Sequence, residues 1–419
     1  MSSLADVQAR ATAPFLPGYA LFGACLAAAG LPIYIHAPKF FVDQYGVSLA
    51  LLGGVLFALR LLDVVQEPLL GWLSDRAGPG MRRWVIGAGA LMALAMVNLF
   101  AVPAPIAPVW WFAITLTVLF SAYSFLTISF YANGVTGAAR LGAGGHLRLA
   151  AWRETGALVG VCAAAAAPVL LAQGSTAPFA AFASGFCVLV MLALMAMRGQ
   201  WAMPERRPAV PMKFGDILAD RIASRLLLVA LFNAAPVAVS STLFLFFVES
   251  RLGAIGWEGP LLVLFFLAAA IAAPLWARAA ERFGAKRVLL MGMCLSVAAF
   301  GLTLGLGSGD VALFALVCLA SGAALGADLT LLPALFSARL ARIAPGSARA
   351  FGLWSFASKA TLALAAGVVL PVLELSGFQS GAVNDAAALT ALTLLYALLP
   401  CVLKTLAILV LIATPIEES

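Results

Sequence analysis

Long apolar segments recur along almost the whole 419-residue chain, and they constrain its fold more than any other feature. One helical crossing of a bilayer needs about 20 consecutive apolar residues. Hydrophobic residues make up 63% of the chain and charged residues 10%, whereas a typical soluble domain has about 25% charged residues. The chain therefore folds in lipid. Twelve apolar segments can be counted, near residues 16–42, 47–74, 84–103, 108–138, 148–172, 177–198, 223–250, 257–280, 288–307, 310–338, 346–376 and 385–414.

Such segments predict an all-α integral membrane protein, because a spanning helix satisfies its own backbone hydrogen bonds. The first segment follows MSSLADVQAR, which has no convincing small-residue cleavage site. Its apolar stretch is also too long for a signal peptide. We therefore expect it to be retained as the first of twelve transmembrane helices.

The net charge of +7 reports topology rather than an anionic partner. Lys and Arg gather in alternate connections, which all lie on one side if both termini are cytoplasmic. The opposite connections are nearly bare of them, with Arg251 as the main exception. This is the positive-inside pattern. It predicts a multi-pass protein of a bacterial inner membrane, with both termini cytoplasmic and no nucleic-acid partner.

A polar, proline-rich connection divides the predicted helices six and six. We expect an N-terminal six-helix bundle over 1–198, a cytoplasmic central loop over 199–222 and a C-terminal six-helix bundle over 223–419. A weak internal repeat supports two pseudo-symmetric halves: Asp75-Arg76-Ala-Gly78 and Glu281-Arg282-Phe-Gly284 each end a helix with an acid, a base and a turn glycine. Parallel six-helix repeats with a solute site between them are how major facilitator transporters are built.

The second predicted helix carries charges in the middle of RLLDVVQEPLLG, residues 60–71. Arg60, Asp63 and Glu67 share one stripe of the helix, with Gln66 beside it. A charge at the bilayer centre costs at least about 2.5–3.5 kcal/mol, so such residues usually face a cavity and have a function. Two carboxylates one turn apart can bind Na⁺ or share a proton. The alternative is a structural Arg60–Asp63 ion pair, which leaves Glu67 without a partner.

The pattern R-x-x-D-x-x-x-[DE]-P-x-x-G resembles that of the glycoside–pentoside–hexuronide cation symporters, the melibiose-permease-like family of the major facilitator superfamily. It also recurs in the related eukaryotic lysophospholipid transporters. FVDQYGVSLALLG (41–53), RLAAWRETGALVG (148–160) and FGLWSFASK (351–359) look like further parts of the family's sequence. The resemblance implies that Asp63 and Glu67 bind the coupling cation, with Gln66 and Ser124 as neutral ligands, and that Arg153 and Lys359 are cavity charges.

The chain departs from the family where carboxylates on the first and fourth helices grip sugar hydroxyls, because Ala27 and Thr127 stand there. Losing these acids while keeping two bases favours an anionic or amphiphilic solute, whereas the family favours a sugar. Glu67 in place of the sodium-coupled carrier's aspartate favours H⁺ over Na⁺.

Other polar residues complete the predicted solute site. Ser124, Thr127 and Tyr131 form one stripe of the fourth helix, although Ser and Thr also bond their own helix's carbonyls. Arg153 can reach the cytoplasmic surface or pair with Glu154. Trp354 lies beside Lys359, and Asp328 is a candidate partner for Lys359. We expect Asp75 and Arg76, with Glu281 and Arg282, to form a cytoplasmic gate.

These observations predict a secondary active transporter, in which H⁺ or Na⁺ drives symport of a small organic solute by alternating access. The alternatives are a transporter of a lysophospholipid-like amphiphile and a non-transporting assembly factor on the same scaffold. We expect no enzyme activity, because the sequence has no nucleophile–base constellation, metal-ligand cluster or phosphate-binding loop after a strand. We also expect no cofactor, no metal beyond Na⁺, and a monomer in the lipid bilayer.

Overall fold

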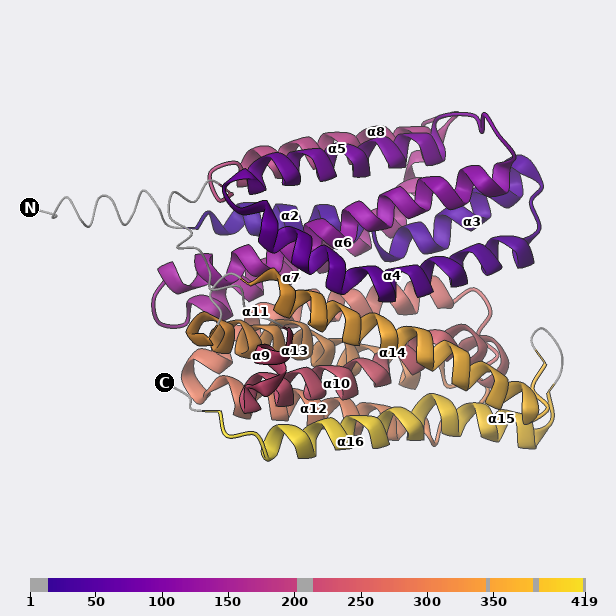
Figure 1. The fold of residues 1–419 in the computed structure, drawn as a ribbon. Coiled ribbons are helices and arrows are strands. Elements are labelled where there is room, and N and C mark those ends of the chain that lie inside the picture. Colours follow the sequence, from indigo (N-terminus) through magenta and orange to yellow (C-terminus); the bar gives the residue numbers. More distant parts are fainter. Residues whose placement is uncertain (1–13, 202–213, 344–346, 380–383, 417–419) are drawn as a thin grey trace, which may run out of the picture. The chain divides into compact units, whose positions relative to one another are not determined.

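A computed structural model describes residues 14–201, 214–343, 347–379 and 384–416. The described residues form helices and no strand, and each predicted span is helical (Figure 1). Nine helical stretches are long and apolar enough to cross a membrane, and one of them, Leu51–Phe100, contains two consecutive helices. The helices are α2 (Leu16–Ala28), α3 (Leu31–Tyr45), α4 (Leu49–Ala77), α5 (Met81–Phe100), α6 (Pro108–Arg140), α7 (Gly145–Leu171), α8 (Pro178–Met197), α9 (Phe214–Ala219), α10 (Arg221–Phe246), α11 (Glu258–Phe283), α12 (Ala285–Thr303), α13 (Val311–Ile343), α14 (Ala348–Leu375), α15 (Ala386–Thr393) and α16 (Leu399–Ile412).

The first predicted span, 16–42, is two helices rather than one. Helix α2 ends before Ala29, and α3 starts after Gly30, with Pro32 in its first turn. Proline lacks the N–H that a helix interior requires and its ring crowds the preceding turn. The chain therefore interrupts the helix just before the proline, where the sequence predicts a continuous span.

Two membrane spans each contain one short π-helical turn, which changes the helical register locally. These turns are Phe247–Arg251, after α10, and Leu394–Leu398, between α15 and α16. A short helix, α9, lies within the segment predicted as the central loop. Most of that loop, residues 202–213, lies outside the described residues, as do both chain termini.

The chain divides into two compact units. Unit 1 comprises Met1–Phe214 with Ser337–Leu353, and unit 2 comprises Gly215–Phe336 with Trp354–Ser419. The last turns of α13 and the first turn of α14 thus pack with unit 1, although the sequence places them in the C-terminal half.

Glycines bring α2 and α7 close together at the centre of unit 1. A methyl group added at Gly156 would lie 2.0 Å from the carbonyl oxygen of Ala20, and one at Gly160 would lie 2.4 Å from that of Ala24. Small residues one turn apart allow membrane helices to approach at backbone distance. This contact fixes the start of α7, which carries Arg153 and Glu154.

Aromatic side chains fill the core of unit 2. The rings of Phe247 and Tyr396 stack with centroids 4.2 Å apart and an interplanar angle of 13°. Phe314 packs against the same stack from α13. Through these ring contacts α13 packs against both π-helical turns.

The internal repeat has a structural counterpart in each unit. Gly78 follows α4 with φ +46°, and Gly284 follows α11 with φ +89°. Residues with a side chain rarely adopt these positive φ values, whereas glycine does so at little cost. The prediction of a turn glycine at both helix ends is confirmed.

Candidate cation and solute site

Helix α4 buries both of its central acids within unit 1. Asp63 is 7% exposed and Glu67 is 0% exposed. Leu62, Val65 and Leu69, on other faces of the helix, are exposed. The fold thus turns the two carboxylates inward and the leucines and valine outward.

A hydrogen-bonded chain links Asp63 to α6. The side-chain amide of Gln66 donates from Nε2 to Asp63 Oδ1 at 2.7 Å. Ser121 Oγ donates to Gln66 Oε1 at 2.8 Å. The Gln66 amide is therefore oriented with its N–H group toward the Asp63 carboxylate, and its oxygen accepts the hydrogen bond from Ser121.

Ser124, the neutral ligand expected from the sequence, is buried one turn further along α6 and is 1% exposed. Ser121 was not predicted as part of the site. Its only sequence signal is its position three residues before Ser124, which places both on one helix face.

The final glycine of the α4 pattern allows α14 to approach the turn that carries Glu67. A methyl group at Gly71 would lie 3.0 Å from the carbonyl oxygen of Ala348, and one at Gly352 would lie 2.9 Å from that of Glu67. Gly71 and Gly352 thus pack backbone against backbone within unit 1. The first turn of α14 is fixed directly beside the turn of α4 that carries Glu67.

A second charged cluster joins α6 and α7. Arg153 Nε donates to Glu154 Oε1 at 2.7 Å, and the Tyr131 hydroxyl donates to the same oxygen at 2.7 Å. The guanidinium carbon of Arg153 lies 3.7 Å from the centre of the Tyr131 ring, a geometry that stabilises a cation over an aromatic face. Arg153 and Glu154 are each 4% exposed.

Arg153 therefore pairs with Glu154, which confirms one of the two alternatives considered from the sequence. It does not extend to the surface, because its side chain is enclosed by Glu154 and Tyr131. The Tyr131 ring also contacts Phe351 at a centroid distance of 5.6 Å, which adds the first turn of α14 to the cluster.

Three buried polar atoms on this part of α6 and α7 have no hydrogen-bond partner among the described residues: Thr127 Oγ1, Arg153 Nη2 and Thr155 Oγ1. Thr127 lies one turn before Tyr131 on α6, and Arg153 covers the Tyr131 ring. Buried polar groups are normally hydrogen-bonded, so each exception requires an explanation.

The site residues of unit 2 are arranged differently from the expectation. Asp328 on α13 forms its ion pair with Lys404 of α16, and Lys404 Nζ also donates to Asn233 Oδ1 of α10 at 2.6 Å. The sequence predicts a pairing of Asp328 with Lys359, and that prediction is wrong because the partner of Asp328 is Lys404. The reason is geometric: Lys404 is 2% exposed and its ammonium needs a buried acid, which α13 provides.

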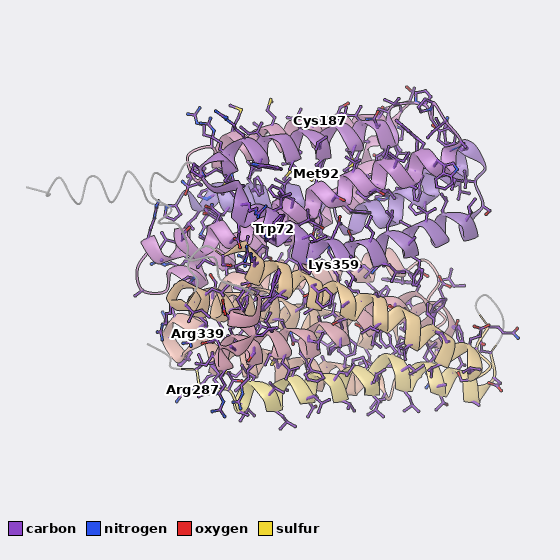
Figure 2. All side chains as sticks on the ribbon, in the orientation of Figure 1. Trp72, Met92, Cys187, Arg287, Arg339 and Lys359 are labelled. Carbon is purple, nitrogen blue, oxygen red and sulfur yellow. The ribbon has the colours of Figure 1, made fainter. Side chains whose placement is uncertain are left out.

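Lys359 is half-buried in the first half of α14 (Figure 2). Trp354, five residues earlier on α14, packs its ring against Phe336 with centroids 5.0 Å apart. Trp354 thus has a packing contact within unit 2, and its predicted role in solute binding stays a prediction.

The predicted gate residues fall into two groups. Asp75 accepts hydrogen bonds from the backbone N–H groups of Ala348 at 2.6 Å and Arg349 at 3.4 Å. It also pairs with the Arg349 guanidinium at 3.3 Å. A carboxylate at a helix N-terminus satisfies free backbone donors and complements the helix dipole. Asp75, at the end of α4, thus binds the start of α14 through these hydrogen bonds and the ion pair.

Arg76 lies over the ring of Trp72, with its guanidinium carbon 4.0 Å from the ring centre. Trp72 lies near the C-terminal end of α4 (Figure 2). Glu281 and Arg282 of unit 2 are exposed at the end of α11. Arg349, which the sequence reading missed as a gate residue, is the basic partner that Asp75 contacts.

Solved structures share this fold. A bacterial homologue of the iron transporter ferroportin, in an outward-facing state, matches with a TM-score of 0.70 at 14% identity, covering 94% of this chain and 99% of that one. The major facilitator transporter FucP, in an outward conformation, matches with a TM-score of 0.66 at 14% identity, covering 96% and 99%. The proton:xylose symporter XylE matches with a TM-score of 0.64 at 14% identity, covering 96% and 95%.

The match to a family model, together with the shared fold, identifies a secondary transporter of the major facilitator superfamily, and not an enzyme. Residues 16–418 match the family described as MFS/sugar transport protein, and the chain belongs to that family. The resemblance to the glycoside–pentoside–hexuronide cation symporters is thereby confirmed. Comparison with curated proteins gave no match.

Proposed function

We propose that this multi-pass membrane transporter couples the movement of a cation, H⁺ or Na⁺, to the symport of a small organic solute. Asp63 and Glu67 bind the cation. The observation that carries this proposal is the burial of two carboxylates one turn apart on α4, at 7% and 0% exposure. Neighbouring carboxylates repel each other, and a shared proton or a bound Na⁺ relieves that repulsion.

The surroundings of Asp63 suit a site that binds and releases a small cation. Gln66 donates to one carboxylate oxygen of Asp63 and is itself oriented by Ser121, so the acid keeps its orientation when the cation leaves. The fold neighbours support H⁺ as the coupling ion, because FucP is a fucose:proton symporter and XylE a proton:xylose symporter. Na⁺ is the alternative that the experiment below distinguishes.

For the solute we propose a neutral, hydroxyl-bearing molecule. Glu154 balances the charge of Arg153, so this cluster has no excess positive charge with which to attract an anion. Thr127 Oγ1 and Arg153 Nη2 are buried donors without a partner among the described residues. Solute hydroxyl groups would supply the missing acceptors, and Thr127 would take over part of the role of the carboxylate that the family has at this position.

Coupling then follows from linkage. A cation on Asp63 and Glu67 raises the affinity for the solute, and the solute raises the affinity for the cation by the same factor. The transporter switches readily between its outward-open and inward-open conformations only when the cation and the solute are both bound or both absent. The positive-inside charge pattern supports a bacterial inner-membrane location with both termini cytoplasmic.

The proposal is tested by the thermal stability of the detergent-purified protein. Neutral sugars, organic anions and lysophospholipids are added separately, each with and without Na⁺ and at an acidic and an alkaline pH. A ligand at 100 times its dissociation constant stabilises the folded state by about 2.7 kcal/mol. We expect one neutral hydroxylated solute to stabilise the wild type in a pH- or Na⁺-dependent way, and we expect Glu67→Gln to abolish that dependence.

Glu374→Gln is the matched control, because Glu374 is an exposed acid at the far end of α14. It should respond like the wild type. Stabilisation by an organic anion or a lysophospholipid alone would reject the proposed solute class. Stabilisation by any solute without a pH or Na⁺ effect would reject coupling.

A further inference from the structure

We propose that a groove between α5 and α8 is a binding site for an anionic phospholipid. The two helices lie side by side within unit 1 (Figure 1). The groove has a volume of about 470 Å³, and most of its lining is apolar. Its lining residues are Arg82, Val85, Ile86, Ala90, Ala93, Cys187, Val190, Met191, Leu194, Met195, Arg198 and Trp201.

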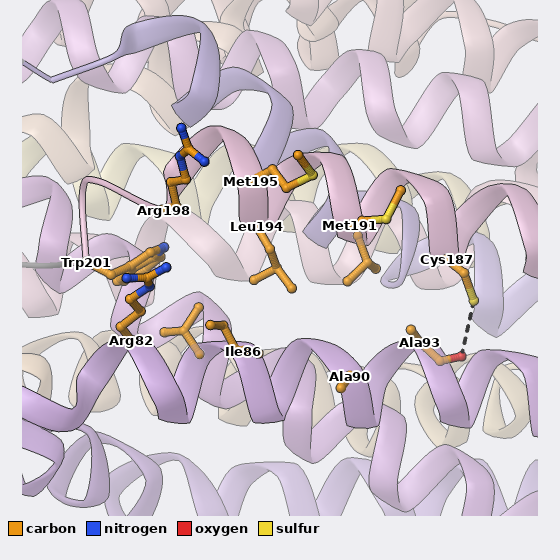
Figure 3. A pocket seen from close by; sticks show the side chains of 12 residues that line it. Arg82, Ile86, Ala90, Ala93, Cys187, Met191, Leu194, Met195, Arg198 and Trp201 are labelled. Atoms are coloured by element: carbon orange, nitrogen blue, oxygen red, sulfur yellow. Dashed lines mark hydrogen bonds between the residues drawn. The ribbon is translucent and has the colours of Figure 1, made fainter.

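All the strong hydrogen-bond donors of the groove lie at one end. Arg82 stands at the start of α5, and Arg198 and Trp201 follow the end of α8, so the antiparallel helices bring them together (Figure 3). Trp201 is 6% exposed, and its indole Nε1 has no hydrogen-bond partner among the described residues. A bound anion would supply an acceptor for this buried donor and would balance the charge of the two arginines that line the same end of the groove.

The other end of the groove is suited to a hydrocarbon chain. Figure 3 shows Leu194 of α8 directed toward the stretch of α5 that carries Ile86 and Ala90, and Cys187 Sγ donates a hydrogen bond to the carbonyl oxygen of Ala93 at the far end. The α5 side of this end is lined by the small residues Ala90 and Ala93, and the α8 side by larger apolar residues such as Leu194. No acidic side chain is among the 12 lining residues.

The separation of charge and apolar surface identifies the ligand class. Guanidinium groups bind phosphate oxygens in a fixed geometry, and a tryptophan N–H at the membrane interface commonly meets the headgroup region. Two arginines without an acid favour a phosphate that carries a net negative charge over a zwitterionic headgroup. An acyl chain lies along Ala90, Val190 and Leu194, and the phosphate lies against Arg82, Arg198 and Trp201.

This site is separate from the transport site. The predicted cation and solute residues lie on α4, α6, α7, α13 and α14, and none of them lines the groove. The lipid is thus a bound partner of the scaffold and not the transported molecule. The inference stands or falls independently of the proposed coupling.

Native mass spectrometry of the purified, delipidated protein tests the proposal. The protein is titrated with phosphatidylglycerol and with phosphatidylcholine of identical acyl chains. At the membrane surface each Arg contributes about 1 kcal/mol to binding an anionic lipid. We expect phosphatidylglycerol to bind about 10- to 30-fold more tightly, and the Arg82→Gln/Arg198→Gln double variant to lose that preference.

Three controls separate a site from general electrostatic attraction. Arg83→Gln removes an exposed arginine beside the groove that does not line it, and should leave the preference intact. Ala90→Trp keeps both arginines but fills the groove, and should weaken binding of both lipids. Glycerophosphoglycerol, the headgroup without chains, should not compete. Equal binding of the two lipids by the wild type, or equal loss in Arg83→Gln and the double variant, would overturn the proposal.

Discussion

At the residue scale, Lys404 shows what a buried charge requires. Its ammonium contacts Asp328 and Asn233, so three helices, α10, α13 and α16, meet at one cation. A buried ion pair adds little net stability over an apolar pair, but leaving one charge without its partner is strongly destabilising. The two members of the pair therefore depend on each other.

We expect Lys404→Met to lower the free energy of unfolding by about 3–5 kcal/mol, because it leaves Asp328 buried without its cation. Adding Asp328→Asn should restore most of that loss. Thermal unfolding in detergent measures both variants, with Arg282→Met as the control for loss of an exposed cation in unit 2. A single variant as stable as the wild type, or a double variant no better than the single, would contradict the role of the pair.

Residue-level prediction succeeded where a pattern lies along one helix. The spacing of Asp63 and Glu67, and the proline and glycine after them, indicated a buried acidic turn from sequence alone. The partners of buried charges could not be predicted, because they depend on how helices distant in sequence are rotated against each other. Ser121 and Lys404 therefore appeared only in the structure, and the choice of Glu154 for Arg153 could not be made in advance.

At the scale of elements, the contact between α2 and α7 is set by glycine. Gly156 and Gly160 give α7 a face without side chains, against which α2 lies at backbone distance. The sequence contains the G-x-x-x-G spacing, but the helix that packs on it is not specified locally. The interruption of the first span at Ala29–Gly30 is similar, since hydropathy alone does not detect a break inside an apolar run.

We expect Gly156→Ala to destabilise the protein by about 1–3 kcal/mol, because the added methyl group would lie 2.0 Å from the Ala20 carbonyl oxygen and must push the helices apart. Gly185→Ala is the matched control: Gly185 is an exposed glycine of α8, and its added methyl group meets nothing within 4 Å. That control should stabilise by about 0.5–1 kcal/mol through helix propensity alone. Thermal unfolding of the two variants should give opposite signs, and a neutral Gly156→Ala would show that the helices are not so closely packed.

At the scale of the whole molecule, hydropathy and charge were sufficient for the class of fold. Twelve apolar spans and a weak internal repeat led to the major facilitator architecture, which the family match and the solved structures confirm. The grouping of Ser337–Leu353 with unit 1 could not be read from the sequence. It follows from Asp75 at the N-terminus of α14 and from the close approach of Gly71 and Gly352.

The central claim is that Asp63 and Glu67 bind the coupling cation, and infrared difference spectroscopy tests it without knowledge of the solute. Spectra of the purified protein are recorded in acidic and alkaline buffer, with and without Na⁺, for the wild type, Glu67→Gln and Glu374→Gln. We predict a protonated-carboxyl band that disappears on raising the pH or on adding Na⁺, is present in Glu374→Gln and is absent from Glu67→Gln. A change with pH alone identifies H⁺ as the ion, and displacement by Na⁺ identifies a sodium site. Identical difference spectra for the wild type and Glu67→Gln in all four buffers would contradict the account.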